Sequence, residues 1–362
     1  MNVLIRVDQS ELIGSGHYQR CLSLAIALYR AGASVSFVAR HLNEIFQSLL
    51  LKYGFNLVML PCRRFEPAQI ALTSDYAGWL GVSEELDADD CRVALAGQKY
   101  DVILVDHYAL GQTWERQMRD HAETIVVIDD LVNRGHDCDV LIDQTYGRRT
   151  SEYAHLVPRW CKVLAGVEYA LLRDEFKFHR MKSLARKRKF ENGRLLISLG
   201  GIDRDNITER LLSEGRSWIA AANLEVTVIL GAGAPHASSV GEVCEKNKWT
   251  FLHNNTDMAG VVTNHDFCIG AAGSSTWERF CLGIPAIVLK LADNQSEIIK
   301  KLVNDGLVRE LNVNNIKGSL EDLEGIWCDR YLSENSADVS KLVDGLGCHR
   351  TVTEIKSKID AP

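Results

Sequence analysis

The sequence alternates short apolar runs with longer helical patterns, and this alternation limits the chain to α/β architectures. The first half contains the runs VLIRV, VSFVA, NLVML, DVILVD and IVVIDD, each followed by a stretch of helical character. The second half repeats the pattern with LLISLGG, VTVIL, FCIGAAG and AIVLK. Several runs are apolar almost throughout, which is typical of parallel strands covered by helices on both faces. The pattern predicts two doubly wound, Rossmann-type α/β units.

The length and one charged stretch set the expected domain boundaries. A chain of 362 residues suits two domains. Residues 180–194, RMKSLARKRKFENGR, are strongly charged and lack strand character. We interpret them as a solvated helix and linker, the alternative being a basic patch that binds a partner. The expected parts are an N-terminal lobe (1–175), a linker (176–194), a C-terminal lobe (195–345) and a C-terminal tail or helix (346–362), with the parallel sheets facing an interdomain cleft.

Composition excludes several classes of partner. The formal net charge is −7, which gives no general attraction to nucleic acid or to an anionic membrane. No run approaches the roughly 18 apolar residues of a membrane span, and the first residues do not resemble a signal peptide. The 10 cysteines show no CxxC pair, so we expect reduced thiols. A cytoplasmic protein is expected, and an anionic ligand must be held locally.

The loop after the first strand contains the candidate catalytic residue. In open α/β sheets, ligands bind beyond the carboxyl ends of the strands. The first strand ends near Asp8, and Gly14 and Gly16 then allow a tight turn or a close approach to a ligand. His17 falls in the first helical turn, where partial positive charge disfavours an imidazolium, so we expect a neutral ring that takes a proton from water. The alternatives are a surface or capping role for His17 and a loop-capping role for Asp8.

Other predicted strands in the first half also end in polar residues. Asp106 ends a strand and is followed by His107 and Tyr108, and Asp129 and Asp130 end the next strand. Paired acids at this position suit sugar hydroxyls or loop capping. They lack further carboxylates at a spacing that would hold a metal, so no metal site is expected.

In the second half, two glycine-rich loops are candidates for nucleotide binding. Gly200 and Gly201 lie between a strand and a helix, where backbone amides can hold a diphosphate without formal positive charge. The segment 267–295 is more specific. Its small residues lead into hydroxyl-bearing residues at a helix start, and Glu278 one turn later can accept hydrogen bonds from both hydroxyls of a ribose.

Separated motifs together resemble one known family. They are, in order, GSGHYQRCLSLA, VDHYAL, DDLVNRGHDCDVLIDQT, YALLRDEF, SLGGIDRDN, AAGSSTWERFCLGIPAIVL, NQ and VDGLGCHRT, and they span nearly the full length. The chain resembles the hydrolases of pseudaminic acid biosynthesis that act on UDP-2,4-diacetamido-2,4,6-trideoxy-β-L-altropyranose. The resemblance implies a GT-B-like fold and removal of UDP without a metal or cofactor. Water would attack the anomeric carbon, with cleavage of the C1–O bond and inversion.

The resemblance also assigns roles to residues. It matches the family's catalytic histidine to His17, its nucleotide-binding segment to residues 273–278 and its sugar-contacting pair to Asn294 and Gln295. Expected partners are a UDP-sugar and water, and we expect a monomer. The substrate-binding set is Asp8, Gly14, Gly16, Tyr108, Asn294 and Gln295, and the UDP-binding set is Gly200, Gly201, Gly273, Ser274, Ser275, Thr276 and Glu278.

Alternatives from other classes remain open at this stage. An inverting GT-B glycosyltransferase would use His17 to activate an acceptor hydroxyl in place of water. Peptidoglycan-type N-acetylglucosaminyltransferases resemble the second lobe, but they usually carry a membrane-facing patch on the first, which the sequence does not show. A nucleotide-sugar 2-epimerase needs further acid and base groups. A non-catalytic nucleotide-sugar-binding protein would bind UDP without turnover.

Overall fold

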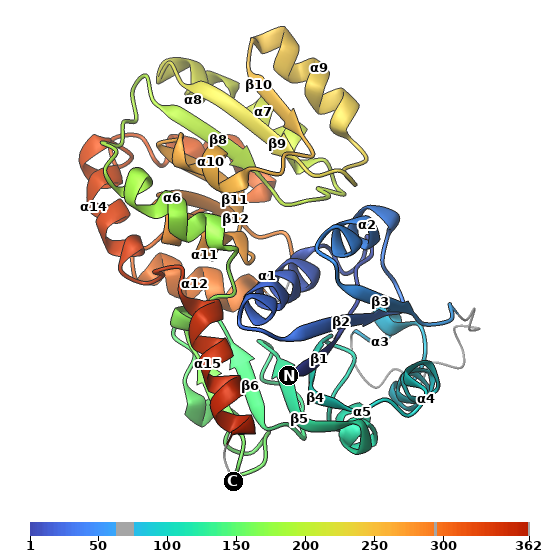
Figure 1. Cartoon of the computed structure of the whole chain (residues 1–362). Coiled ribbons are helices and arrows are strands. Elements are labelled where there is room, and N and C mark those ends of the chain that lie inside the picture. Colours follow the sequence, from blue (N-terminus) through green and yellow to red (C-terminus); the bar gives the residue numbers. More distant parts are fainter. Residues whose placement is uncertain (63–75, 293–294, 361–362) are drawn as a thin grey trace. The chain divides into compact units, whose positions relative to one another are not determined.

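The computed structural model describes residues 1–62, 76–292 and 295–360 (Figure 1). The chain divides into two compact units, unit 1 (Met1–Leu171 with Leu346–Pro362) and unit 2 (Leu172–Gly345). This division differs from the expected one, because the C-terminal helix belongs to unit 1 and residues 176–194 belong to unit 2. Across the described residues, no helix is both long enough and apolar enough to cross a bilayer.

The described residues of unit 1 form a seven-stranded parallel sheet in the order β3-β2-β1-β4-β5-β6-β7. The strands are β1 (Asn2–Val7), β2 (Ser34–Ala39), β3 (Asn56–Met59), β4 (Tyr100–Asp106), β5 (Ala122–Ile128), β6 (Val140–Asp143) and β7 (Lys162–Ala165). The helices are α1 (Gly16–Arg30), α2 (Glu44–Lys52), α3 (Ala77–Leu80), α4 (Glu84–Leu95), α5 (Gln112–Met118) and α15 (Gly347–Ile359), with short 3-10 helices η2 (Arg119–His121), η3 (Thr150–Tyr153) and η4 (Val167–Tyr169).

Both faces of the unit 1 sheet are buried, as the apolar strands predict. Val3 and Ile5 on one face of β1 pack in a core that includes residues of α1 and α15, whereas Leu4 packs on the other face with residues of α4 and α5. Helix α15, drawn in red in Figure 1, contacts α1. Its apolar residues Cys348 and Ile355 are buried in the same core, which explains why the chain terminus belongs to unit 1.

The described residues of unit 2 form a six-stranded parallel sheet in the order β10-β9-β8-β11-β12-β13. The strands are β8 (Arg194–Ser198), β9 (Glu225–Leu230), β10 (Thr250–His253), β11 (Phe267–Ala271), β12 (Ala286–Leu289) and β13 (Arg309–Leu311). The helices are α6 (Asp174–Leu184), α7 (Ile207–Glu214), α8 (Arg216–Ala221), α9 (Ala237–Asn247), α10 (Met258–Thr263), α11 (Ser275–Cys281), α12 (Ser296–Asn304), α13 (Ile316–Glu321) and α14 (Asp329–Ser340), with the 3-10 helix η6 (Val313–Asn315).

The charged stretch expected to be a solvated linker is partly built into unit 2. Arg180, in α6, donates hydrogen bonds to the carbonyl oxygens of Ser340, Val343 and Cys281. Arg188 is buried and also donates to carbonyl oxygens. Guanidinium groups are favoured at such places because the last carbonyls of a helix have no partner within the helix. These two arginines therefore stabilise unit 2, and they are not a solvated face.

Strand β1 carries a charged residue, Arg6, inside the core. Its fully buried guanidinium donates to Asp8 Oδ1 at 2.5 Å and to Asp87 Oδ1 at 3.0 Å. Asp87, on α4, also accepts from Arg40 Nε and from Trp114 Nε1, each at 3.0 Å. Buried charges are tolerated when each has a partner of opposite sign. This network joins α4 to the sheet.

Replacing Asp87 by Ala is expected to lower the free energy of unfolding by about 3–5 kcal/mol, because Arg6 and Arg40 would lose a buried partner. Urea unfolding of the purified variant measures this loss. Asp89 on the same helix is a matched control, because its exposed carboxylate pairs with Arg92 near the surface. Asp89→Ala should cost less than about 1 kcal/mol. Equal losses in the two variants would contradict the structural role given to Asp87.

Candidate active site

Each sheet has one place where the strand order reverses direction relative to the chain. In unit 1 the chain leaves β1 toward β2 and β3 and then returns to β4 on the other side of β1. In unit 2 the same reversal occurs between β8 and β11. Open α/β sheets bind ligands at such switch points, beyond the carboxyl ends of the strands. The loops after β1, β4, β8 and β11 are therefore the candidate sites, and they hold most of the residues selected from the sequence.

His17 lies in the first turn of α1, as expected. Gly14 has a φ of +76°, which residues with a side chain rarely adopt, and Gly16 is the first residue of the helix. The Nδ1 atom of His17 lies 2.6 Å from Asp106 Oδ1 at the end of β4. An ionised carboxylate can only accept hydrogen bonds, so Nδ1 carries the proton and Nε2 keeps a lone pair. The ring is thereby held in the tautomer that acts as a base through Nε2.

Arg20 keeps Asp106 ionised. Its Nε atom donates to Asp106 Oδ2 at 2.6 Å and its Nη2 atom to Oδ1 at 2.7 Å. Burial alone would raise the pKa of Asp106, but the charge of Arg20 and the hydrogen bonds from Arg20 and His17 outweigh burial and hold that pKa well below its usual range. Arg20 follows His17 by three residues, so both side chains lie on one face of α1. We call His17, Asp106 and Arg20 the base cluster.

Aromatic rings pack against the base. The ring centroid of Tyr108 lies 4.5 Å from that of His17 at an interplanar angle of 82°, and the ring of Trp79 lies 6.0 Å away at 84°. The Tyr108 hydroxyl donates to Asp130, which also accepts from Arg20 Nη1 at 2.8 Å. These edge-to-face contacts restrict rotation of the imidazole. The structure thus brings His17 and Tyr108 together, and a contact between Tyr108 and substrate stays a prediction.

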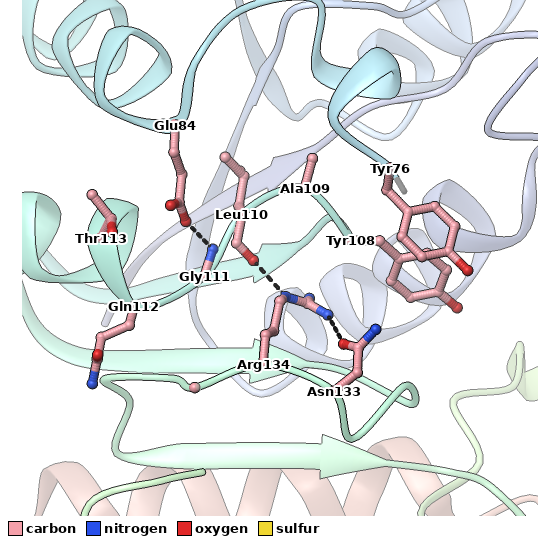
Figure 2. Close-up of a pocket in the computed structure, with 11 residues that line it drawn as sticks. Tyr76, Glu84, Tyr108, Ala109, Leu110, Gly111, Gln112, Thr113, Asn133 and Arg134 are labelled. Atoms are coloured by element: carbon pink, nitrogen blue, oxygen red, sulfur yellow. Dashed lines mark hydrogen bonds between the residues drawn. The ribbon is translucent and has the colours of Figure 1, made fainter. Parts of the chain in front are cut away.

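Tyr108 also lines a cavity of about 480 Å³ in unit 1. Figure 2 shows the rings of Tyr76 and Tyr108 side by side at one end, and Arg134 reaching the carbonyl of Leu110 below them. Arg134 pairs with Asp129 at 2.6 Å, and Glu84 accepts the backbone N–H of Gly111, so both charges have partners in the protein. The amides of Gln112 and Asn133 also line the cavity. Such a lining suits an uncharged polar ligand.

The Asp8 carboxylate is enclosed by groups of the protein, and its expected contact with sugar hydroxyls stays a prediction. The carboxylate is fully buried and accepts from the Arg6 guanidinium at 2.5 and 2.9 Å. It also accepts the backbone N–H groups of Arg40 at 2.7 Å and His41 at 3.2 Å. Oδ1 thus joins the ends of β1 and β2, while Oδ2 accepts from Arg6. The alternative interpretation, in which Asp8 caps the loop, agrees with these contacts.

His107 gives a prediction for the pH dependence of stability. Its Nδ1 atom accepts the Ala109 N–H at 3.1 Å, and its Nε2 atom lies 3.5 Å from Asp8 Oδ2. Burial lowers the pKa of His107 to about 4, even though the charge of Asp8 acts in the opposite direction. The usual value is about 6.5, so the unfolded chain binds more protons between pH 4 and 6.5. Stability from this group is present above that window and falls as the pH falls through it.

Replacing His107 by Asn keeps an acceptor near the Ala109 N–H but removes the titrating ring. Relative to the wild type, the variant should lose roughly 3 kcal/mol less stability between pH 7 and pH 4, since each pKa unit corresponds to about 1.4 kcal/mol. Urea unfolding at the two pH values measures the difference. The same pH dependence in both proteins would contradict the buried, neutral state of His107.

In unit 2, the loop after β8 brings backbones close together. Gly200 has a φ of +106°, and a Cβ atom at Gly231 would lie 2.3 Å from the carbonyl oxygen of Gly201. The Asp203 carboxylate accepts two backbone N–H groups at the start of α7, each at 2.9 Å. The start of α7 is therefore already capped by a carboxylate. Phosphate binding by Gly200 and Gly201 stays a prediction, and it concerns the loop amides and not this helix.

The loop after β11 has the arrangement expected from the sequence. Gly273 and Ser274 lie between the end of β11 and the start of α11. Ser275 Oγ and Thr276 Oγ1 both accept hydrogen bonds from Arg279, at 3.1 and 2.9 Å. Small residues and hydroxyl groups thus line the switch point of unit 2. The assignment of this loop to UDP remains a prediction.

Glu278 is the candidate ribose-binding residue. Its Oε1 atom lies 3.9 Å from Arg173 Nη2. Burial raises the pKa of Glu278, while the positive charges of Arg173 and Arg279 act against this shift. A carboxylate held near two arginines can accept hydrogen bonds from a diol.

Of the expected sugar-contacting pair, Asn294 and Gln295, the structure describes only Gln295. Asn294 lies outside the described residues. Gln295 immediately precedes α12, and its Oε1 atom accepts the backbone N–H of Leu291 at 2.9 Å. The side-chain carbonyl of Gln295 therefore closes its own loop in this structure, while its role toward a sugar stays a prediction.

Sequence reasoning placed His17 correctly in the first turn of a helix but missed its hydrogen-bond partners. Asp106 was recognised only as a strand end, and Arg20 was not considered, although both belong to the base cluster. Two signals were present in the sequence. An arginine follows His17 at helical spacing, and an aspartate ends the strand that returns beside β1 at the switch point.

Comparisons with known proteins identify distant relatives, and no protein-family model matches the chain. The UDP-2,4-diacetamido-2,4,6-trideoxy-beta-L-altropyranose hydrolase of Campylobacter jejuni is 27% identical over 256 residues, 70% of this chain and 76% of that protein. The spore coat polysaccharide biosynthesis protein SpsG of Bacillus subtilis is 24% identical over 61% of this chain, and the uncharacterized protein MJ1062 of Methanocaldococcus jannaschii is 21% identical over 88%. The alignments span 65% of SpsG and 61% of MJ1062.

Solved structures confirm the fold class. MurG of Acinetobacter baumannii has a TM-score of 0.66 and 12% identity, with 98% of this chain and 99% of that chain covered. MnaA of S. aureus, solved with UDP, has a TM-score of 0.62 and 15% identity, with 99% and 97% covered. At these identities the likeness establishes the fold alone. The chain has a GT-B-like fold with two parallel-sheet α/β units, as expected.

Proposed function

We propose that the protein is a nucleotide-sugar hydrolase that removes UDP from UDP-2,4-diacetamido-2,4,6-trideoxy-β-L-altropyranose. One observation carries the proposal: His17, Asp106 and Arg20 form a hydrogen-bonded base at the switch point of unit 1. The Campylobacter jejuni relative is named for this reaction, which supports the choice of substrate class. The proposal thus has two parts, the removal of UDP by water and the identity of the sugar.

The base cluster suits attack by water on the anomeric carbon. Nε2 of His17 accepts a proton from water as its oxygen bonds to C1. The bond between C1 and the glycosidic oxygen breaks, and its electron pair leaves with UDP. One water and one UDP-sugar therefore give free sugar, UDP and a proton, with inversion at C1. Asp106 stabilises the imidazolium that forms, since Arg20 keeps this carboxylate ionised.

The loops of unit 2 suit the departing nucleotide. UDP is a good leaving group and needs little protonation, so its developing charge chiefly requires hydrogen-bond donors. In the proposal, residues 273–276 and the amides of Gly200 and Gly201 supply these donors, and Glu278 accepts the ribose hydroxyls. The placement of both loops at one switch point supports this division of roles.

The cavity beside Tyr108 suits the sugar. Its arginine and glutamate are paired within the protein, so it offers aromatic surface and neutral amides without an unpaired charge. A hexose with two acetamido groups is uncharged and has both apolar and hydrogen-bonding parts. The match supports a diacetamido sugar over a sugar acid, whose carboxylate would need a free cation.

The decisive experiment incubates the purified protein with the UDP-diacetamido sugar in water enriched in heavy oxygen. The proposal predicts UDP release with water as the sole acceptor, and mass spectrometry should find the label in the free sugar and not in UDP. Label in UDP would show cleavage on the phosphorus side. Release that requires an added acceptor would instead identify a glycosyltransferase, and UDP binding without turnover would identify a binding protein. Each of these three results contradicts the proposal.

A further inference from the structure

Arg279 of unit 2 is a buried cation that none of the roles assigned above explains. Its side chain donates from Nη2 to the Ala271 carbonyl at 2.7 Å and to Thr276 Oγ1 at 2.9 Å, and from Nη1 to Ser275 Oγ at 3.1 Å. The residue is 3% exposed, and its Nε atom has no hydrogen-bond partner among the described residues. All three acceptors are neutral. Burial of a cation is costly, and the carboxylate whose charge acts on Arg279 is that of the preceding residue, Glu278.

The backbone is shaped to admit this guanidinium. A Cβ atom at Gly270 would lie 2.7 Å from Arg279 Nη1 and 3.0 Å from the Ser198 carbonyl oxygen. Gly270 and Ser198 are paired at the carboxyl ends of β11 and β8. These two strands are neighbours in the sheet, and the switch point of unit 2 lies between them. A glycine is therefore needed where the charge lies directly beneath the candidate UDP loop.

A second buried arginine in the same unit has acceptors of a different kind. Arg188 is 2% exposed and donates to the carbonyl oxygens of Ser183, His265 and Leu282. These carbonyls lie at or just after the C-terminal ends of α6, α10 and α11, where helix dipoles place partial negative charge. The acceptors of Arg279 instead include hydroxyls at the start of α11, where the partial charge is positive. Arg279 therefore lies beside hydroxyls at a helix start, whereas Arg188 lies at helix ends, and burial lowers the pKa of both guanidinium groups.

The hydrogen bonds of Arg279 also orient a hydroxyl group. Ser275 Oγ accepts from the guanidinium, so its own O–H points away from Arg279 and can donate to a ligand. The Ser275 side chain is half-buried, whereas Thr276 is buried and holds the first turn against Arg279. A hydroxyl group that is free to donate, held in place by a buried cation, is an arrangement that favours an anion.

We propose that Arg279 is a positioning residue for the diphosphate of a uridine nucleotide, acting through its charge and through the Ser275 hydroxyl. This inference rests on the proposed function and deepens it, since it assigns recognition of the phosphates to a residue outside the predicted UDP-binding set. It predicts that the contribution of Arg279 to affinity grows with the number of phosphates on the ligand.

The test measures binding of uridine, UMP and UDP by isothermal titration calorimetry to the wild type, Arg279→Gln and Arg188→Gln. Arg279→Gln should weaken UDP binding by about tenfold or more and UMP binding by less, and should leave uridine binding within about twofold. Arg188→Gln loses an equally buried arginine that contacts the opposite end of α11 from the loop, so it should change all three affinities by the same factor. Equal losses for all three ligands in Arg279→Gln, or no loss for UDP, would overturn the proposal.

A second variant covers the case in which Arg279→Gln does not fold. Gly270→Ala keeps the arginine but displaces its guanidinium, and it should lower the ratio of UDP affinity to uridine affinity. An unchanged ratio in this variant overturns the role of Arg279. A folded wild-type protein that binds none of the three ligands contradicts the proposed function itself, and with it this role. Tight UDP binding by the wild type together with equal losses in the variant contradicts the role of Arg279 alone.

Discussion

Replacing His17 by Asn is expected to lower kcat for UDP release by about 10²- to 10⁴-fold, the usual contribution of a general base. The Asn side chain can still hydrogen-bond to Asp106 but cannot take a proton from water. Affinity for UDP should stay within about twofold of the wild type, because the nucleotide contacts are assigned to unit 2. Steady-state kinetics and calorimetry with UDP check the two parts separately.

A matched control for this variant is His121→Asn. His121 is half-buried in η2, which precedes β5 and so lies at the opposite end of the unit 1 sheet from the base cluster. Its replacement should leave kcat unchanged. A His17 variant that turns over as fast as this control would show that the imidazole does not act in the reaction.

Replacing Asp106 by Asn should lower kcat by on the order of 10²-fold or more, although the imidazole remains. An amide that turns its N–H₂ group toward Nδ1 favours the opposite tautomer, in which Nε2 carries the proton and cannot act as a base. The change also leaves the buried guanidinium of Arg20 without its ionised partner at 2.6 Å. Activity should therefore fall together with stability.

The loss of activity must be separated from the loss of stability. Asp101→Asn, at the other end of β4, is the control variant. Asp101 accepts the Asn2 N–H in an exposed position and lies outside the base cluster. Circular dichroism at the assay temperature gives the folded fraction of each variant. If the loss of kcat in Asp106→Asn equals its loss of folded protein, Asp106 has a structural role only.

The long apolar strands were all predictable, whereas most of the short ones were not. Every run selected from the sequence overlaps a strand of the structure. The strands missed are β6, β7, β10 and β13, which have three or four residues each. Three of them, β7, β10 and β13, are edge strands, where one neighbouring strand supplies the pairing, and β6 is next to an edge. Such pairing depends on residues far along the chain, which local periodicity does not reveal.

The unit boundaries depended on packing that the sequence does not encode locally. The apolar face of α15 suits any hydrophobic surface, and its place in the core of unit 1 follows from shape complementarity with α1. The charged stretch 180–194 was interpreted from composition alone. Its arginines Arg180 and Arg188 are instead used to satisfy helix-terminal carbonyls, a role that becomes visible only once the helices are assembled.

The candidate site was predictable where a single loop defines it. Glycines before a helix start selected His17 correctly as a first-turn residue, and the small residues before α11 selected the loop of unit 2. Asp106 lies 89 residues from His17 in the sequence, so its contact with His17 depends on the strand order of the sheet. Asp8 was included because it ends a strand, but buried Arg6 takes up its carboxylate.

The most direct test of the central claim, that His17 and Asp106 act as one base, is a double-mutant cycle on kcat for UDP release. It compares the wild type, His17→Asn, Asp106→Asn and the double variant. If the carboxylate works only through the imidazole, the double variant should be about as slow as His17→Asn alone. Losses that multiply in the double variant would show that the two residues act independently and would contradict the account.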